Sequence, residues 1–148
     1  MPGYRGHVVG GLATFGVLRL LIASYNPTLL TSVEWALFAL LGALLPDIDI
    51  KSRGQNIFYV ALAGAYAGAL VAGHLSWSPF FVVAALFPML VTHRGISHRW
   101  WFAVLFSCSV GFGLSVTFPF YVQAAWFNAL FLCAGMLSHS ILDRWLSQ

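Results

Sequence analysis

The residues that are able to do chemistry are few, and most of them fall in four short stretches of the chain. Among 148 residues, four are acidic and five are histidines. One stretch holds His7, and the other three read PDID (46–49), HRGISHR (93–99) and SHSILD (138–143). Imidazole and carboxylate together suit zinc, manganese or iron, whereas magnesium and calcium prefer sites made of oxygen alone. The candidate metal ligands are His7, Asp47, Asp49, His93, His98, His139 and Asp143.

The spacing within these stretches favours a shared site. His139 and Asp143 are four residues apart, so on a helix their side chains lie on one face, one turn apart. Asp47 and Asp49 are two apart, and an extended chain after Pro46 would point both carboxylates to one side. The number of candidate ligands is larger than the four that one tetrahedral ion binds. We therefore expect one or two transition-metal ions, with zinc first and manganese or iron as alternatives, and two ions would lie about 3.5–4 Å apart.

Each stretch has a simpler interpretation when it is taken alone. A histidine and an aspartate at a helix end commonly form a structural hydrogen bond, a Pro-Asp step is common in turns, and the basic HRGISHR stretch would suit lipid headgroups. Metal binding is favoured because all four stretches occur in a chain with so few polar residues, and ionisable groups are costly in a membrane. His74 and Glu34 are expected at the opposite membrane face.

The elements that must position these residues are membrane helices. The chain is 60% hydrophobic and only 7% charged, whereas soluble domains carry about a quarter of charged residues. We expect a single integral-membrane domain over residues 1–148, folded as an all-α helical bundle. No cleavable signal peptide is evident, since the first apolar stretch contains Arg19. The predicted spans are roughly 8–25, 33–46, 57–73, 79–92, 101–118 and 122–142.

The basic residues indicate which face is cytoplasmic. Six alternating spans place both termini and the loops 47–56 and 93–100 on the same side. The basic residues on that side are Arg5, Lys51, Arg53, Arg94, Arg99 and Arg144. The positive-inside rule therefore assigns both termini and the metal cluster to the cytoplasm. Because the net charge of +3 is accounted for in this way, it does not indicate nucleic-acid binding.

Two further features concern depth and packing. The second and fourth predicted spans have about 14 residues each, or roughly 21 Å of helix, against a hydrocarbon core about 30 Å thick. This shortness predicts that the metal cluster is recessed below the membrane surface. In the third span, Gly64 and Gly68 form a GxxxG pair, which suits close packing of helices within the chain or in a homo-oligomer.

The ordered set of motifs resembles a known family. His7, GALLPDID (42–49), THRGISH (92–98) and GMLSHSILD (135–143) together resemble the YdjM-like family of predicted membrane-bound metal-dependent hydrolases. The resemblance covers nearly the whole chain, and it implies a bacterial inner-membrane location, hydrolase chemistry and the same seven metal ligands. The histidine and aspartate set is also similar, more distantly, to the zinc-dependent phospholipase C group, which suggests a phosphoester substrate.

These observations lead us to expect a hydrolase that acts on a membrane lipid or another phosphoester. Asp49 would orient or deprotonate the attacking water, and Arg94 would neutralise charge on phosphate oxygens, although Arg94 is equally suited to be a positive-inside anchor. The alternative is a non-catalytic metal-binding, sensing or transport protein. Haem binding is less favoured because three aspartates accompany the histidines, and the absence of HExxH gives a zincin-type protease no support.

Overall fold

A computed structural model describes residues 4–47, 53–71, 73, 78, 81–82, 85 and 98–146. Every regular element in these ranges is a helix, which confirms the all-α prediction. The chain divides into two compact units, one made of Met1–Pro46 with Ser97–Gln148 and the other of Asp47–Ile96. The larger unit carries most of the candidate ligands, and its described helices form a bundle.

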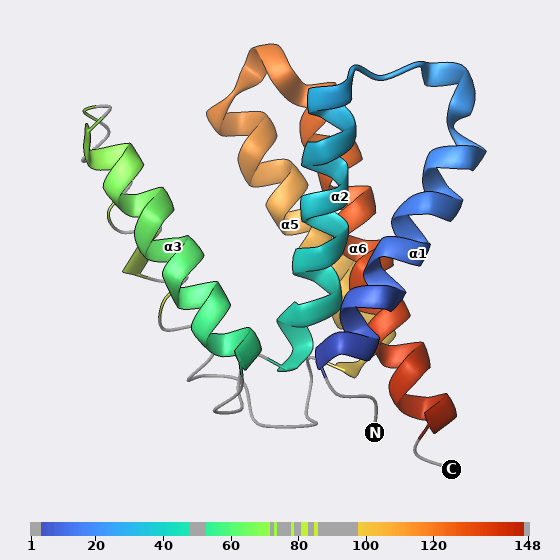
Figure 1. The fold of residues 1–148 in the computed structure, drawn as a ribbon. Coiled ribbons are helices and arrows are strands. Elements are labelled where there is room, and N and C mark those ends of the chain that lie inside the picture. The colour runs from blue at the N-terminus through green and yellow to red at the C-terminus, as the bar shows by residue number, and fades with distance from the viewer. Residues whose placement is uncertain are drawn as a thin grey trace. The chain divides into compact units, whose positions relative to one another are not determined.

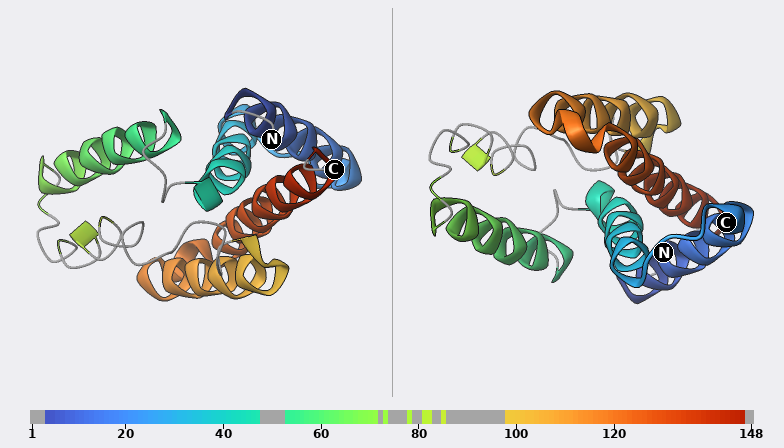
Figure 2. Two further views of the ribbon diagram at one scale, coloured as in Figure 1. Left: turned by 90° about the horizontal axis from the view of Figure 1, so that it is seen from below. Right: turned by 90° about the horizontal axis from the view of Figure 1, so that it is seen from above.

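The larger unit is an antiparallel arrangement of four long helices (Figure 1). They are α1 (Tyr4–Leu21), α2 (Leu29–Leu44), α5 (Trp100–Thr117) and α6 (Val122–Leu146), with short 3-10 turns η1 (Ala23–Tyr25), η2 (Leu45–Asp47) and η5 (Pro119–Tyr121). Helix α6 packs against each of the other three. The starts of α1 and α5 and the ends of α2 and α6 lie at one end of this unit, together with both chain termini (Figures 1 and 2). Segments that are distant in sequence are therefore brought to a common end.

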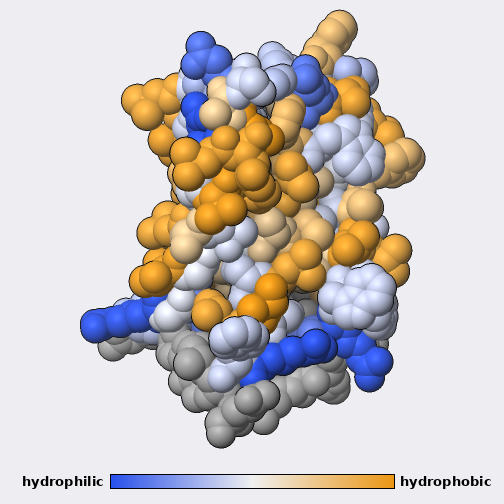
Figure 3. All heavy atoms as spheres, turned by 90° about the vertical axis from the view of Figure 1, so that its right-hand side faces the viewer, coloured by the Kyte–Doolittle hydropathy of each residue, from blue (hydrophilic) through white to orange (hydrophobic). Residues whose placement is uncertain are grey.

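Three stretches within the described residues are long and apolar enough to cross a membrane: Leu29–Asp47, Trp100–Thr117 and Pro119–Trp145. Many large apolar side chains of these helices face outwards, as the exposure of Leu29, Phe112 and Leu130 illustrates. On the face drawn in Figure 3, apolar side chains form a broad belt between polar side chains at the two ends. Outward-facing apolar belts of this kind are expected where lipid rather than water surrounds a protein.

Helix α2 is longer than the sequence predicted. It begins at Leu29 because the side chain of Thr28 caps it, accepting a hydrogen bond of 3.2 Å from the Thr31 N–H. At the other end η2 continues the helical path through Pro46, whose fixed φ is compatible with a helical turn. Leu29–Asp47 therefore has 19 residues, or roughly 28 Å. The predicted shortness of this span and the predicted extended chain at Asp47 are both wrong.

The closest approach of two helices in the larger unit lies between α2 and α6. A Cβ atom added to Gly42 would overlap the carbonyl oxygen of Leu132, and one added to Gly135 would overlap the carbonyl oxygen of Ala39. Beyond these glycines, Trp35 of α2 stacks on Phe131 of α6 with ring centroids 5.0 Å apart. The glycines thus let the two backbones meet at the level just before the candidate ligands.

The smaller unit contains α3 (Arg53–Val71). The Tyr59 hydroxyl donates a 3.2 Å hydrogen bond to the carbonyl of Ala85, and the hydroxyls of Tyr66 and Ser78 are also 3.2 Å apart. Most of the predicted span 79–92 lies outside the described residues. An added Cβ on Gly64 or Gly68 would meet nothing within 4 Å, so among the described residues this pair makes no close helix contact.

We predict that Gly42→Ala destabilises the bundle by about 1–3 kcal/mol, because the added methyl group collides with rigid backbone of α6 rather than with a flexible side chain. The measurement is the thermal unfolding midpoint of the purified protein in detergent. Gly113→Ala in α5 is the matched control, since its methyl group would meet nothing within 4 Å. Equal midpoints for the two variants would contradict the close α2–α6 contact.

Candidate metal centre

Four side chains of the larger unit meet at the end where its termini lie. His7 is in the first turn of α1, His98 lies two residues before α5, and His139 and Asp143 are one turn apart near the end of α6. The predicted face shared by His139 and Asp143 is thus present. His139 is completely buried and His7 is 1% exposed, while His98 and Asp143 are 14% and 13% exposed. The four side chains are thus largely buried within the end of the bundle, even though α2 is not the short span from which this burial was predicted.

Three ligand atoms of this group form a nearly equilateral triangle. His98 Nε2 and His139 Nε2 are 3.3 Å apart, and each lies 3.4 Å from Asp143 Oδ2. Charge-assisted hydrogen bonds between imidazolium and carboxylate are shorter, at about 2.7–2.9 Å. Bonds of 2.0–2.1 Å from a tetrahedral zinc ion would instead separate its ligand atoms by about 3.3–3.4 Å. The spacing therefore fits three ligands around one point better than a hydrogen-bonded network.

The far side of the His139 ring is held by the backbone of α2. His139 Nδ1 lies 2.8 Å from the carbonyl oxygen of Ala43. A carbonyl oxygen only accepts, so Nδ1 must carry the proton that it donates, and in the neutral ring the Nε2 lone pair is then directed at His98 Nε2 and Asp143 Oδ2. Metal-binding histidines almost always have such a partner on the second ring nitrogen. The close α2–α6 contact supplies that partner here.

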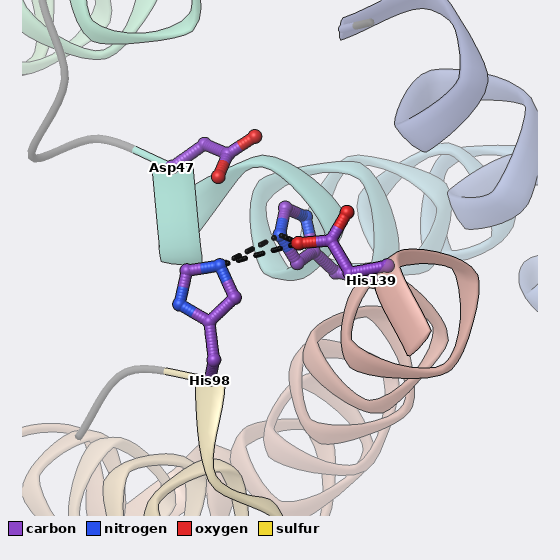
Figure 4. Close-up of side chains that lie close together, drawn as sticks. Asp47, His98 and His139 are labelled. Carbon is purple, nitrogen blue, oxygen red and sulfur yellow. Dashed lines mark hydrogen bonds and ion pairs between the residues drawn. The ribbon is translucent and has the colours of Figure 1, made fainter. Parts of the chain in front are cut away.

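A fourth ligand atom comes from Asp47, at the end of η2. Asp47, His98, His139 and Asp143 each offer one ligand atom, and these atoms all lie within 4.8 Å of one another. Figure 4 shows Asp47, His98 and His139 coming from three separate elements and pointing towards one another. Two imidazoles and two carboxylates are a donor set suited to zinc, manganese or iron.

His7 extends the group on its other side. Its Nε2 lies 3.5 Å from Asp143 Oδ1, the oxygen that does not belong to the triangle. The His7 and His139 rings are stacked with centroids 3.8 Å apart and an angle of 19° between them. Asp143 therefore offers one oxygen to His98 and His139 and the other to His7.

The structure thus brings together five of the seven predicted ligands: His7, Asp47, His98, His139 and Asp143. Asp49, His93 and Arg94 lie outside the described residues, as does His74. Glu34 is in the early part of α2, far along the helix from Asp47, and it accepts a 2.6 Å hydrogen bond from the side-chain amide of Asn128. Sequence reasoning missed the role of the Ala43 carbonyl, because a backbone acceptor has no residue signature.

Comparison with known proteins gives one match. No curated protein and no solved structure is detectably similar to this chain. A family model does match, and it covers residues 1–148. Since the match extends over the entire sequence and three stretches of the described residues are long and apolar enough to cross a membrane, the chain belongs to the YdjM inner membrane protein family.

Proposed function

We propose that this protein is a metal-dependent hydrolase embedded in the bacterial inner membrane, acting at the cytoplasmic face on a lipid or another phosphoester. The observation that carries the proposal is the triangle of His98 Nε2, His139 Nε2 and Asp143 Oδ2, with edges of 3.3–3.4 Å. These lengths match the distances between ligand atoms around a tetrahedral zinc ion. Asp47 completes a four-residue donor set. Because ionisable side chains at a membrane boundary cost free energy, a cluster of them is expected to have a function.

The residues of the chain would divide the work as follows. His98, His139, Asp143 and Asp47 hold the ion, for which zinc is the first choice and manganese or iron are alternatives. When bound, a transition metal polarises an ester or phosphoryl oxygen and lowers the pKa of a water molecule to about 7. Asp49 would orient that water and accept its proton. Arg94, with its planar pair of donors, would neutralise charge on the phosphate oxygens.

A second ion would use the other side of the group. His7 Nε2 and Asp143 Oδ1 face each other at 3.5 Å, and His93 and Asp49 are the remaining predicted ligands for that position. The Asp143 carboxylate would then bridge the two ions.

The membrane topology that we propose has six spans with both termini in the cytoplasm. Arg5, Arg99 and Arg144 are exposed at the metal-centre end of the larger unit, and Trp100 and Trp145 are exposed beside two of them. Tryptophans are enriched at both membrane boundaries, and an excess of basic residues favours the cytoplasmic one. Homo-oligomerisation through the Gly64 and Gly68 face of α3 is a further part of the proposal, supported by the open space that both glycines have among the described residues.

We predict that the protein, purified without chelators and supplied with zinc or manganese, retains one or two metal ions per chain. Asp143→Asn should weaken metal binding by at least about 10–100-fold, since even changes behind the ligands have effects of that size. Elemental analysis and metal titration provide the measurements. Asn preserves the shape of the side chain, so loss of metal is separable from loss of the fold.

His74→Ala serves as the matched control, because His74 is the histidine that the sequence places at the opposite face. Its metal content should equal that of the unsubstituted protein. If unsubstituted protein that remains monodisperse in detergent takes up neither zinc nor manganese, the metal centre is refuted.

We predict that the metal-loaded protein releases product from a total bacterial lipid extract, and that Arg94→Gln lowers kcat by about 10²–10³-fold while the metal content is unchanged. Asp49→Asn should lower kcat by about 10²–10⁴-fold. Arg19→Gln, in the last turn of α1 at the other end of the helix, is the control and should leave kcat unaltered. A fully loaded protein that leaves every lipid and phosphoester intact would instead identify a non-catalytic metal-binding protein.

The topology yields a separate prediction. With Cys108 and Cys133 replaced by alanine, a cysteine introduced at Gln148 should be inaccessible to a membrane-impermeant maleimide in intact cells, and one introduced at Asn26 should react. The accessibility of the two sites should reverse in inside-out vesicles. Labelling of Gln148→Cys from the outside of intact cells would contradict the cytoplasmic assignment.

A further inference from the structure

A groove runs along the outer surface of the larger unit between α5 and α6. It has a volume of about 560 Å³, and its surface is almost entirely apolar. Its walls include Val104, Cys108, Gln123, Trp126, Leu130 and Cys133. Between one third and one half of the Val104, Trp126 and Leu130 side chains is exposed, at 40%, 44% and 43%. The groove is therefore open at the apolar surface that faces lipid and is not an internal cavity.

Along the axes of α5 and α6, the groove begins beyond the metal centre and extends away from it. Cys133 precedes His139 by six residues on α6, and Val104 follows His98 by six residues on the antiparallel α5, so on both helices the separation is roughly 9 Å. From Cys133 the groove follows α6 for ten residues to Gln123, a further distance of roughly 15 Å. That distance is about half of a hydrocarbon core 30 Å thick, which is the depth of one lipid leaflet.

The same two helices carry positive charge at the metal-centre end. Arg99 immediately precedes α5, and Arg144 lies in the last turn of α6; both side chains are exposed. Guanidinium groups bind phosphate oxygens through paired donors and are therefore well suited to an anionic lipid headgroup. One helix pair thus presents two cations at the membrane boundary and an apolar groove extending inwards from it.

We propose that the α5–α6 groove holds an acyl chain of an anionic phospholipid, whose phosphate lies at the metal centre beside Arg99 and Arg144. This rests on the proposed function and names its substrate class. Along the helix axis, an offset of roughly 9 Å separates the centre from the groove, which leaves room for a glycerol-sized linker between phosphate and chain. A lipid chain suits the walls because it has no polar groups to satisfy, whereas an unfolded peptide would leave its backbone unpaired there.

The proposal is tested by photocrosslinking in phosphatidylethanolamine vesicles that contain a small fraction of phosphatidylglycerol with a diazirine in one acyl chain. Crosslinked residues are identified by mass spectrometry. We expect them to concentrate on Trp126, Leu130 and their groove neighbours. Val104→Trp and, independently, Leu130→Trp should each lower the crosslinking yield by roughly fivefold or more, because an indole occupies the space of the chain. Leu105→Trp, on the neighbouring exposed position of α5 outside the groove, should leave the yield unchanged.

The headgroup is tested with a phosphatidylcholine probe that carries the same acyl chain. We expect the anionic probe to crosslink more efficiently, and this preference should disappear in the Arg99→Gln, Arg144→Gln double variant. Crosslinks spread evenly over the lipid-facing residues of α5 and α6, or equal yields for the two headgroups, would each overturn the proposal.

This readout does not depend on catalysis. The crosslinking yield is measured without turnover, so failure of hydrolysis with intact crosslinking would refute the enzyme and leave lipid binding standing. Hydrolysis of a water-soluble phosphoester with unlocalised lipid crosslinks would refute the groove assignment alone.

Discussion

The structure depends on one contact, the hydrogen bond between His139 Nδ1 and the Ala43 carbonyl at 2.8 Å. It requires the backbones of α2 and α6 to meet, which Gly42 and Gly135 permit because neither has a side chain to separate the helices. A buried imidazole without a partner would be strongly disfavoured in an apolar bundle. The contact both satisfies this ring and directs its second nitrogen at the neighbouring ligands, so helix packing and ligand geometry have a common origin.

The antiparallel order of the helices then determines where the remaining ligands lie. His7 and His98 stand at helix starts, and Asp47 and Asp143 at or near helix ends, so alternating direction brings all of them to one end of the bundle. Side chains at helix ends reach a polar boundary without interrupting the helical hydrogen bonds, which a membrane requires to be complete. A chain of only 148 residues is thereby able to assemble a polar centre while its spans remain apolar.

The sequence allowed a good prediction of those features that have a periodic or compositional signal. The expected span 101–118 agrees closely with α5 at Trp100–Thr117, and the i, i+4 relation correctly placed His139 and Asp143 on one face. The prediction from the sequence missed the early start of α2 at Leu29, because that start depends on a single capping threonine. Nor did it identify the close helix contact, because the glycines involved, Gly42 and Gly135, lie in different spans and form no local pattern.

A hydrogen bond elsewhere in the bundle can be compared with the distances in the candidate metal centre. At the other end of α2, Glu34 and Asn128 are separated by 2.6 Å, the distance of a direct hydrogen bond. If the histidine and aspartate group were simply another polar pair buried between helices, comparable contacts would be expected. Its atoms instead stay 3.3–3.4 Å apart in three directions, as atoms do when they surround a common centre. The difference between the two ends therefore supports ligand geometry at one of them and structural hydrogen bonding at the other.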